Sequence, residues 1–406
     1  MEELKIKRTE LKENNKSISQ KDYSSRLIWI GLICWLSEFA VGVSFFSLPP
    51  LINEIKESFA ISNAEVGLLM AIPNMAFVVF SIFIGIFVDK WGSYKSSLIS
   101  LCLMGIPGIL KGFSVNYFQF FLLTSIQSLG AVIVRPTINK MIKSKFPKQH
   151  YGKGLGMVST GMASGIIFVF FFTPLIKIFW KWIILLYSFI PLLILIIYLN
   201  NRSLLESGDR LIEKHFDFSS LIIKDWRVYY VGLFYFVTTL TYFGLTNWLP
   251  QFLLQEEFPF QPSWASALMI FTGIFSAIFI PFIFDWIKNK MFFVKLIVIG
   301  LGLSVYYLIK VPGIYKIFII ALLGIFNGPI RPMLNTLAIN LVKKGQEIGK
   351  ITGLLLTLAN IGGFLGVWLI GLIKDSTQSF YSGFILLTFF SVIVAIIPIK
   401  LRTEKI

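Results

Sequence analysis

The chain has 406 residues, of which 56% are hydrophobic and only 14% are charged, and its formal net charge is +16. A soluble domain is nearer one quarter charged, so this composition excludes an ordinary soluble globular protein and indicates one built for lipid. The positive charge would suit nucleic acid. Its lysines and arginines, however, gather between the apolar runs on one side, as membrane topology requires, so we expect no nucleic-acid partner.

Apolar runs of roughly 20 residues, the length that crosses a bilayer, recur along the whole chain. The first 26 residues are polar and basic, and no small-residue cleavage site follows the first run. We therefore interpret that run as a membrane span and not as a signal peptide. The pattern predicts an all-α membrane protein with twelve transmembrane helices, at residues 27–51, 65–88, 96–113, 117–141, 154–176, 180–199, 227–251, 264–284, 292–309, 314–341, 351–372 and 381–399.

The connecting segments fix the orientation. Lysine and arginine are about four times as frequent in the segments on the side of the N-terminus as in those on the opposite side. This bias predicts that both termini are cytoplasmic. We expect a multi-pass integral protein of the cell membrane, either the inner or the plasma membrane.

An internal duplication divides the chain into two halves. Arg-Pro-Thr-Ile-Asn at 135–139 returns as Arg-Pro-Met-Leu-Asn at 331–335, and Asp89 returns as Asp285 at the same spacing. Long repeats of this kind predict two parallel six-helix bundles. The expected organisation is a cytoplasmic basic tail, an N-terminal bundle, a cytoplasmic linker, a C-terminal bundle and a short cytoplasmic tail, at residues 1–26, 27–200, 201–225, 226–399 and 400–406.

The residues that usually carry enzyme chemistry are scarce. Cys34 and Cys102 both lie within apolar runs, so no disulfide framework is expected. His150 and His215 lie in the connecting segments on the inner side. No metal, nucleophile or phosphate-loop pattern is present, and we expect neither an enzyme nor a cofactor.

The loop between the second and third runs carries a recognisable motif. Residues 85–95, Gly-Ile-Phe-Val-Asp-Lys-Trp-Gly-Ser-Tyr-Lys, resemble the signature G-x-x-x-D-[RK]-x-G-x-[RK]-[RK] of the major facilitator superfamily, with Tyr94 as the one departure. The second half keeps the aspartate. The resemblance extends over residues 27–399 and implies the major facilitator fold, in which spans one, four, seven and ten line a central cavity.

This loop is also a candidate gate. A carboxylate at the membrane surface can dock on a neighbouring helix N-terminus, in a contact made in one conformation and broken in another. The alternative interpretation is a solvated turn. The predicted gating residues are Gly85, Asp89, Lys90, Gly92, Lys95 and Asp285.

A narrower resemblance concerns the substrate. Residues 358–366 and Asn-Trp-Leu-Pro at 247–250 resemble the anion:cation symporters and their cyanate- and nitrate-type relatives. The arginine that many proton-coupled members carry in the fourth span would fall near Thr124 and is missing. Residues 161–165 lack the proline of the antiporter signature. These departures disfavour drug/proton exchange and leave it open.

Three ionisable side chains fall within the runs: Glu38, Arg135 and Arg331. Placing a charged group in lipid costs free energy, so each of these residues is a candidate for a functional role. Glu38 lies about 16 Å along the first span, near its middle. Burial favours its neutral acid and an arginine partner favours its carboxylate, so alternating exposure would load and release a proton. The alternative is a permanently paired core acid.

The two arginines belong to polar stripes on their spans. A guanidinium presents a planar fork of donors that fits a carboxylate or another oxyanion, so the pair is predicted to clamp an anion. Alternatively, each arginine satisfies carbonyls freed by the proline that follows it, or forms an inner gate with a residue such as Asp89. The predicted substrate-binding residues are Arg135, Arg331, Asn139, Asn335, Gln127, Asn327, Tyr242 and Thr238.

Taken with the resemblance, these residues predict a secondary active transporter that takes up a small organic or inorganic anion with protons by alternating access. Two alternatives stay open: a proton-driven exporter of drugs or metabolites, and a non-transporting membrane receptor or scaffold on the same fold. We expect a monomer whose partners are a small-molecule substrate, a proton or another coupling ion, and the bilayer.

Overall fold

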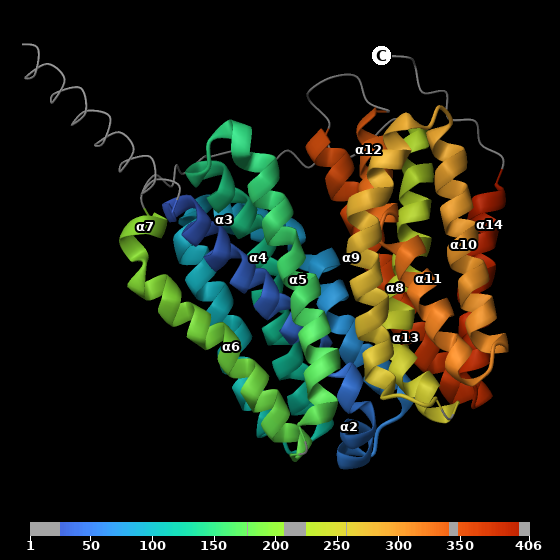
Figure 1. Ribbon diagram of the computed structural model, residues 1–406. Coiled ribbons are helices and arrows are strands. Elements are labelled where there is room, and N and C mark those ends of the chain that lie inside the picture. The colour runs from blue at the N-terminus through green and yellow to red at the C-terminus, as the bar shows by residue number, and fades with distance from the viewer. Residues whose placement is uncertain (1–24, 177, 207–224, 257, 341–347, 398–406) are drawn as a thin grey trace, which may run out of the picture.

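The computed structural model describes residues 25–176, 178–206, 225–256, 258–340 and 348–397, and this part of the chain is almost entirely helical (Figure 1). Outside the described residues lie most of the predicted N-terminal tail (1–26), most of the predicted linker (201–225) and all of the predicted C-terminal tail (400–406). One helix occupies residues 25–46. It is followed by α2 Ile52–Phe59, α3 Asn63–Gly112, α4 Tyr117–Lys145, α5 Tyr151–Phe172, α6 Trp180–Asn200, α7 Arg202–Glu206, α8 Trp226–Gln255, α9 Pro262–Trp286, α10 Lys290–Lys310, α11 Lys316–Asn327, α12 Ile330–Asn340, α13 Ile348–Thr377 and α14 Phe380–Ile396.

The helices have the lengths that a bilayer demands. Within the described residues, eleven are long and apolar enough to cross a membrane, and the shorter apolar helix Phe380–Ile396 brings the number to twelve. Large side chains such as Phe83, Phe279 and Phe282 point outward and are more than half exposed, as lipid-facing positions are. The prediction of an all-helical, multi-pass membrane protein is confirmed.

α3 contains two predicted spans joined by a sharp reversal. Gly92 has φ 79° and ψ 166°, a conformation in which a Cβ would be strained. The second glycine of the loop motif is therefore the residue that turns the chain. At its start α3 carries a capping box, in which Ser62 and Glu65 exchange hydrogen bonds.

The tenth predicted span is broken. Residues 314–341 read as one apolar run, but the helix ends at Asn327 and resumes as α12. Pro329 has no N–H to donate to the helix, and Gly328 packs so closely on α9 that a Cβ there would lie 2.0 Å from the Gly273 carbonyl oxygen. As a result, Arg331 lies in the first turn of α12.

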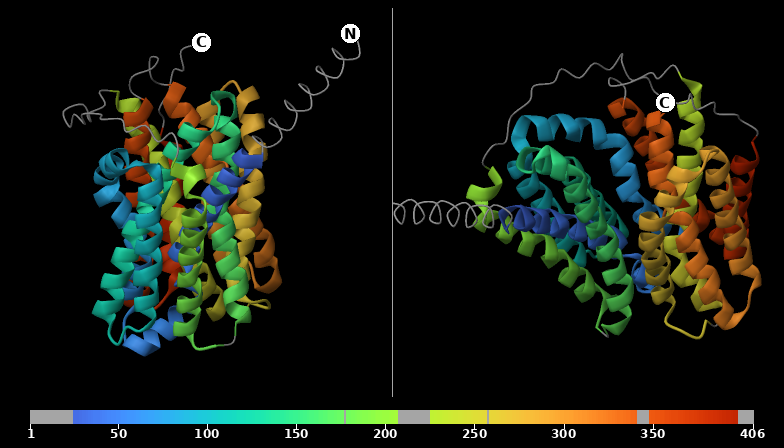
Figure 2. Two further views of the ribbon diagram at one scale, coloured as in Figure 1. Left: turned by 90° about the vertical axis from the view of Figure 1, so that its left-hand side faces the viewer. Right: turned by 45° about the horizontal axis from the view of Figure 1, so that its top comes forward.

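The helices form two groups (Figures 1 and 2). The N-terminal group runs from helix 25–46 to α7, and the C-terminal group from α8 to α14. α13 packs along α3 and α9 along α5, which joins the groups. Helix 25–46 begins and α14 ends at the same end of the molecule. This end is the one predicted to be cytoplasmic and is called the cytoplasmic end below; the opposite end is called the outer end.

Helix 25–46 lies in backbone contact with α5. A Cβ at Gly42 would lie 2.1 Å from the Met162 carbonyl oxygen, and one at Gly165 would lie 2.2 Å from that of Phe39. Small residues permit such close crossings between membrane helices. The crossing holds Glu38 directly beside α5.

Candidate functional site

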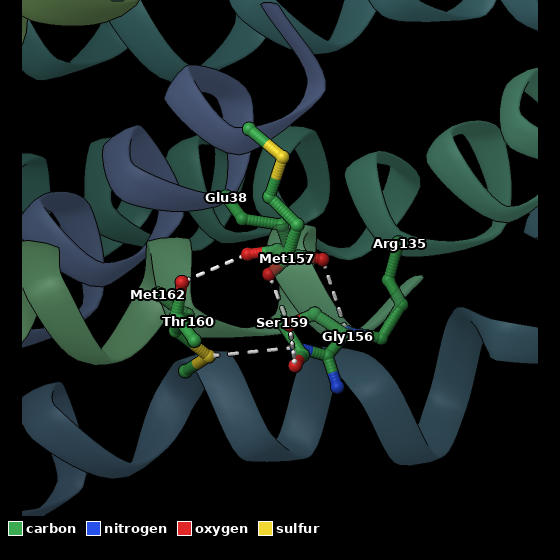
Figure 3. Close-up of polar contacts among 7 residues, drawn as sticks. All are labelled: Glu38, Arg135, Gly156, Met157, Ser159, Thr160 and Met162. Carbon is green, nitrogen blue, oxygen red and sulfur yellow. Dashed lines mark hydrogen bonds and ion pairs between the residues drawn. The ribbon is translucent and has the colours of Figure 1, made fainter. Parts of the chain in front are cut away.

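Glu38 and Arg135 form a two-pronged ion pair between helix 25–46 and α4 (Figure 3). Arg135 Nε donates to Glu38 Oε1 at 3.1 Å, and Nη2 donates to Oε2 at 3.0 Å. The Glu38 side chain is 4% exposed and that of Arg135 is 44% exposed. The carboxylate is thus covered by the guanidinium, whose other edge remains open.

α5 supplies the surroundings of this pair (Figure 3). Arg135 Nη2 lies 4.0 Å from the Met162 sulfur. One turn away, Trp35 Nε1 donates to the Thr160 hydroxyl at 3.0 Å. These neighbours are polarisable or neutral, so in the described part of the chain Glu38 is the one carboxylate that balances Arg135.

Arg331, the repeat partner of Arg135, has a different environment. Its guanidinium carbon lies 4.9 Å from the ring centroid of Tyr242 and 5.7 Å from that of Phe243. Stacking on aromatic faces stabilises a cation without neutralising it. Among the described residues Arg331 forms no ion pair with a carboxylate, so the two equivalent arginines are electrostatically unlike.

Tyr235 of α8 lies near both arginines. Its side chain is buried on α8, within electrostatic reach of both Arg135 and Arg331. The two arginines therefore flank one site between the groups. Tyr235 was not among the predicted site residues, although it precedes the predicted residue Tyr242 by about two turns of the same helix.

The remaining predicted substrate-binding residues divide into two sets. Asn139 is exposed one turn beyond Arg135, while Asn327 and Asn335 are partly exposed on the helices that flank the break. Gln127 is buried, donates to the Met104 carbonyl and accepts from Lys111 Nζ at 2.7 Å.

Thr238 is also buried and donates to carbonyls of its own helix, those of Phe234 and Tyr235. The polar atoms of Gln127 and Thr238 are thus engaged in helix packing. We leave both residues out of the site.

The predicted gate loop lies at the cytoplasmic end. Lys140 Nζ of α4 lies 3.2 Å from Asp89 Oδ1 and also donates to the Val88 carbonyl. The aspartate therefore pairs within its own group here, with a lysine and not with Arg135. A Cβ at Gly85 would meet no atom within 4 Å, so the face of the motif is open. Lys90, Lys95 and Asp285 are exposed.

The outer end is closed. Asp375 of α13 accepts hydrogen bonds from the start of α3, and Trp264 of α9 donates to the Phe171 carbonyl of α5 at 3.2 Å. The Trp264 and Phe171 rings also stack, with centroids 5.6 Å apart. The hydrogen bonds that join the two groups through described residues lie at this end. The two groups are therefore joined at the outer end.

Apolar spans in two groups, with charged side chains held between them and one end closed, define a multi-pass membrane transporter. The profile of the Major Facilitator Superfamily matches residues 34–367. The chain belongs to this family, whose members are secondary transporters and not enzymes.

Individual relatives are distant. A D-galactonate transporter of Escherichia coli O6:H1 is 24% identical over 236 residues, which cover 50% of this chain and 54% of that protein. The multidrug resistance protein MdtG of Rahnella sp. is 29% identical over 140 residues, covering 33% of this chain and 34% of that protein. The chain thus matches about half the length of the first relative and a third of the second.

Solved structures support the fold. A bacterial homologue of the human lysosomal transporter Spinster, in an inward-facing and occupied conformation, superposes with a TM-score of 0.71 at 13% identity. The match covers 90% of this chain and 95% of that one. The inward-facing and unoccupied form of the same homologue gives a TM-score of 0.68 at 14% identity, with 92% and 94% coverage.

Proposed function

We propose that this transporter takes up a small organic anion together with protons, and that Arg331 binds the anion while Glu38 carries the proton. One observation carries the proposal: of two equivalent arginines beside one site, Arg135 is neutralised by a carboxylate, whereas Arg331 pairs with no carboxylate among the described residues. An empty site with an uncompensated cation lowers the free energy of an anion that enters it. The likeness to a D-galactonate transporter supports an organic acid as the substrate.

Arg331 is suited to this role by its geometry. Tyr242 and Phe243 lie against its guanidinium, and its N–H groups have no hydrogen-bond partner among the residues that the structure describes. A carboxylate accepts two parallel hydrogen bonds from such a guanidinium. Asn335, one turn further along α12, and the hydroxyl of Tyr235 supply neutral groups for the polar body of the substrate.

Glu38 couples the proton to the anion through Arg135. While Glu38 is ionised, both of its oxygens engage the guanidinium. Protonation removes this attraction and frees Arg135 to bind the anion together with Arg331. Because linkage is reciprocal, a bound anion also raises the affinity of Glu38 for the proton. One monovalent anion with one proton moves no net charge.

In this proposal the loop motif at residues 85–95 closes the cytoplasmic end. A Cβ at Gly85 on α3 or at Gly353 on α13 would meet no atom within 4 Å. When α13 approaches α3 at this end, these glycines permit close contact. Asp89 would then exchange Lys140 for a group on α13.

Export of drugs is the second candidate, because one stretch of the chain is similar to MdtG. An exporter of lipophilic cations has no use for an uncompensated arginine, so it would tolerate substitution of Arg331. An anion carrier would lose its substrate.

Uptake into proteoliposomes tests the proposal. Sugar acids, other monocarboxylates and lipophilic cations are offered with and without an inward proton gradient, to wild type and to the Glu38→Gln, Arg135→Ala and Arg331→Ala variants. Glu206→Gln, which breaks an exposed ion pair with Arg202 on α7, serves as the control. We expect proton-driven accumulation of an anion by wild type and the control, and its loss in all three site variants. Accumulation of cations alone would reject the proposal.

A further inference from the structure

The first span of α3, which begins at Asn63, packs in its outer half along the outer half of α13. This contact is called the outer seam below. It is unusually close because glycines line it. A Cβ at Gly371 would lie 2.4 Å from the Asn63 carbonyl oxygen, and one at Gly67 would lie 3.2 Å from that of Val367. The two helices belong to different groups, so the outer seam must part whenever the site opens outward.

Asp375 holds the outer seam at its outer end. Its Oδ1 accepts from the Asn63 backbone N–H at 3.0 Å and from Asn63 Nδ2 at 2.6 Å. Its Oδ2 accepts from the Ala64 backbone N–H at 2.7 Å. The first N–H groups of a helix have no partner within the helix and carry its positive dipole end. A carboxylate of one group therefore caps a helix of the other.

The capping contact is oriented by a lysine. Lys56 of α2 donates to Asn63 Oδ1 at 2.6 Å. With its oxygen engaged, the Asn63 amide turns its Nδ2 towards Asp375. The three side chains form one chain of charge-assisted hydrogen bonds, which are stronger than neutral ones.

Asn74 lies in the same seam further inward. It lies about 16 Å along α3 from Asn63. Its side chain is 2% exposed, and in the described part of the chain its Oδ1 has no hydrogen-bond partner. That oxygen lies 2.8 Å from where a Cβ at Gly363 would be, beside the ring of Phe243. A buried acceptor that loses water without gaining a donor destabilises the state that buries it.

We infer that the outer seam is a balanced latch, in which Asp375 stabilises the closed outer end and Asn74 destabilises it. Opening would break the hydrogen bonds of Asp375 and would return the Asn74 amide to water. The two effects oppose each other, so neither conformation traps the transporter. The inference rests on alternating access between the two groups and not on the identity of the substrate.

The test measures the conformation directly and without substrate. Spin labels are attached at Val115→Cys and Ile314→Cys, exposed outer-end positions of the N-terminal and C-terminal groups, after Cys34 and Cys102 are replaced. Electron–electron distance measurements in nanodiscs then give the ratio of outward-open to outward-closed molecules. The variants are Asp375→Asn, Asn74→Leu and the double substitution. Ser376→Ala is the control, because its hydroxyl donates to the Ile373 carbonyl of its own helix.

We expect Asp375→Asn to raise the outward-open ratio and Asn74→Leu to lower it, each on the order of tenfold, with the double variant between them. The control should match wild type. An unchanged ratio in a folded, monodisperse Asp375→Asn protein would overturn the latch, as would an outward shift in Asn74→Leu. Because no anion is present, failure here leaves the proposed anion uptake standing, and failure of anion uptake leaves the latch standing.

Discussion

Replacing Glu38 with glutamine separates the charge of this side chain from its shape. The amide fills the same space beside Arg135 but cannot neutralise it. Unit charges about 3 Å apart attract by about 5 kcal/mol at an effective dielectric constant of about 20. Because the Arg135 side chain is 44% exposed, water screens much of this attraction. We expect about 1 kcal/mol to appear as tighter anion binding, roughly a fivefold gain.

Titration calorimetry of purified protein over a range of pH measures this effect. In wild type, anion affinity should rise as the pH falls, because protonation of Glu38 frees Arg135. In Glu38→Gln the affinity should be high at every pH, and proton-driven accumulation in proteoliposomes should be lost. A variant whose anion affinity still follows pH as wild type does would refute the coupling of Glu38 to Arg135.

Three further predictions concern the framework. A Cβ at Gly161 would lie 2.5 Å from the Trp35 carbonyl oxygen, so Gly161→Ala should displace helix 25–46 and lower the uptake rate at least tenfold. Gly156→Ala is the control and should transport normally, because a Cβ there would meet no atom within 4 Å. Gly92→Ala forces a Cβ into a backbone conformation that is essentially restricted to glycine and should destabilise the protein by about 1–3 kcal/mol in chemical unfolding. Hydrogen bonds from Arg227 lower the pKa of Asp225, so Asp225 stabilises the fold above its ordinary pKa and loses that effect as the pH falls through the lowered value. The melting temperature of Asp225→Asn should therefore lie slightly below that of wild type at neutral pH and match it in acid.

The fold was accessible from the sequence because hydropathy and charge placement are properties of long segments. Twelve runs, a positive inner side and the repeated Arg-Pro-x-x-Asn were sufficient to predict two parallel six-helix bundles, and the loop motif at residues 85–95 added the resemblance to the major facilitator superfamily. The break before α12 was not predicted, because the apolar run continues through Gly328 and Pro329, the two residues at which the helix breaks.

The site was accessible only in part. Glu38, Arg135 and Arg331 stand out as charges in lipid, but periodicity does not say which of them pair. Arg135 pairs with a carboxylate, whereas Arg331 stacks on aromatic rings. The difference depends on Glu38, which has no equivalent in the second half of the repeat. Gln127 lies on the expected stripe, yet the buried Lys111 on α3 engages it. Such partners lie on other helices, beyond the reach of a local pattern.

The outer seam was not predicted at all. Asp375 is one acid just beyond the predicted span 351–372, and Asn74 is a single amide in an apolar run. Their opposite effects depend on how α13 lies against α3, which is a property of the assembled helices.

The affinity of Arg331→Ala for an anion, compared with that of wild type by titration calorimetry, tests the central claim most directly. Hydrogen bonds to a charged group contribute roughly 1.5–3 kcal/mol, so the account predicts an affinity about 10- to 150-fold lower, partly restored in Arg331→Lys. Binding of a lipophilic cation should show no such loss. Anion binding of wild-type strength in Arg331→Ala would contradict the account.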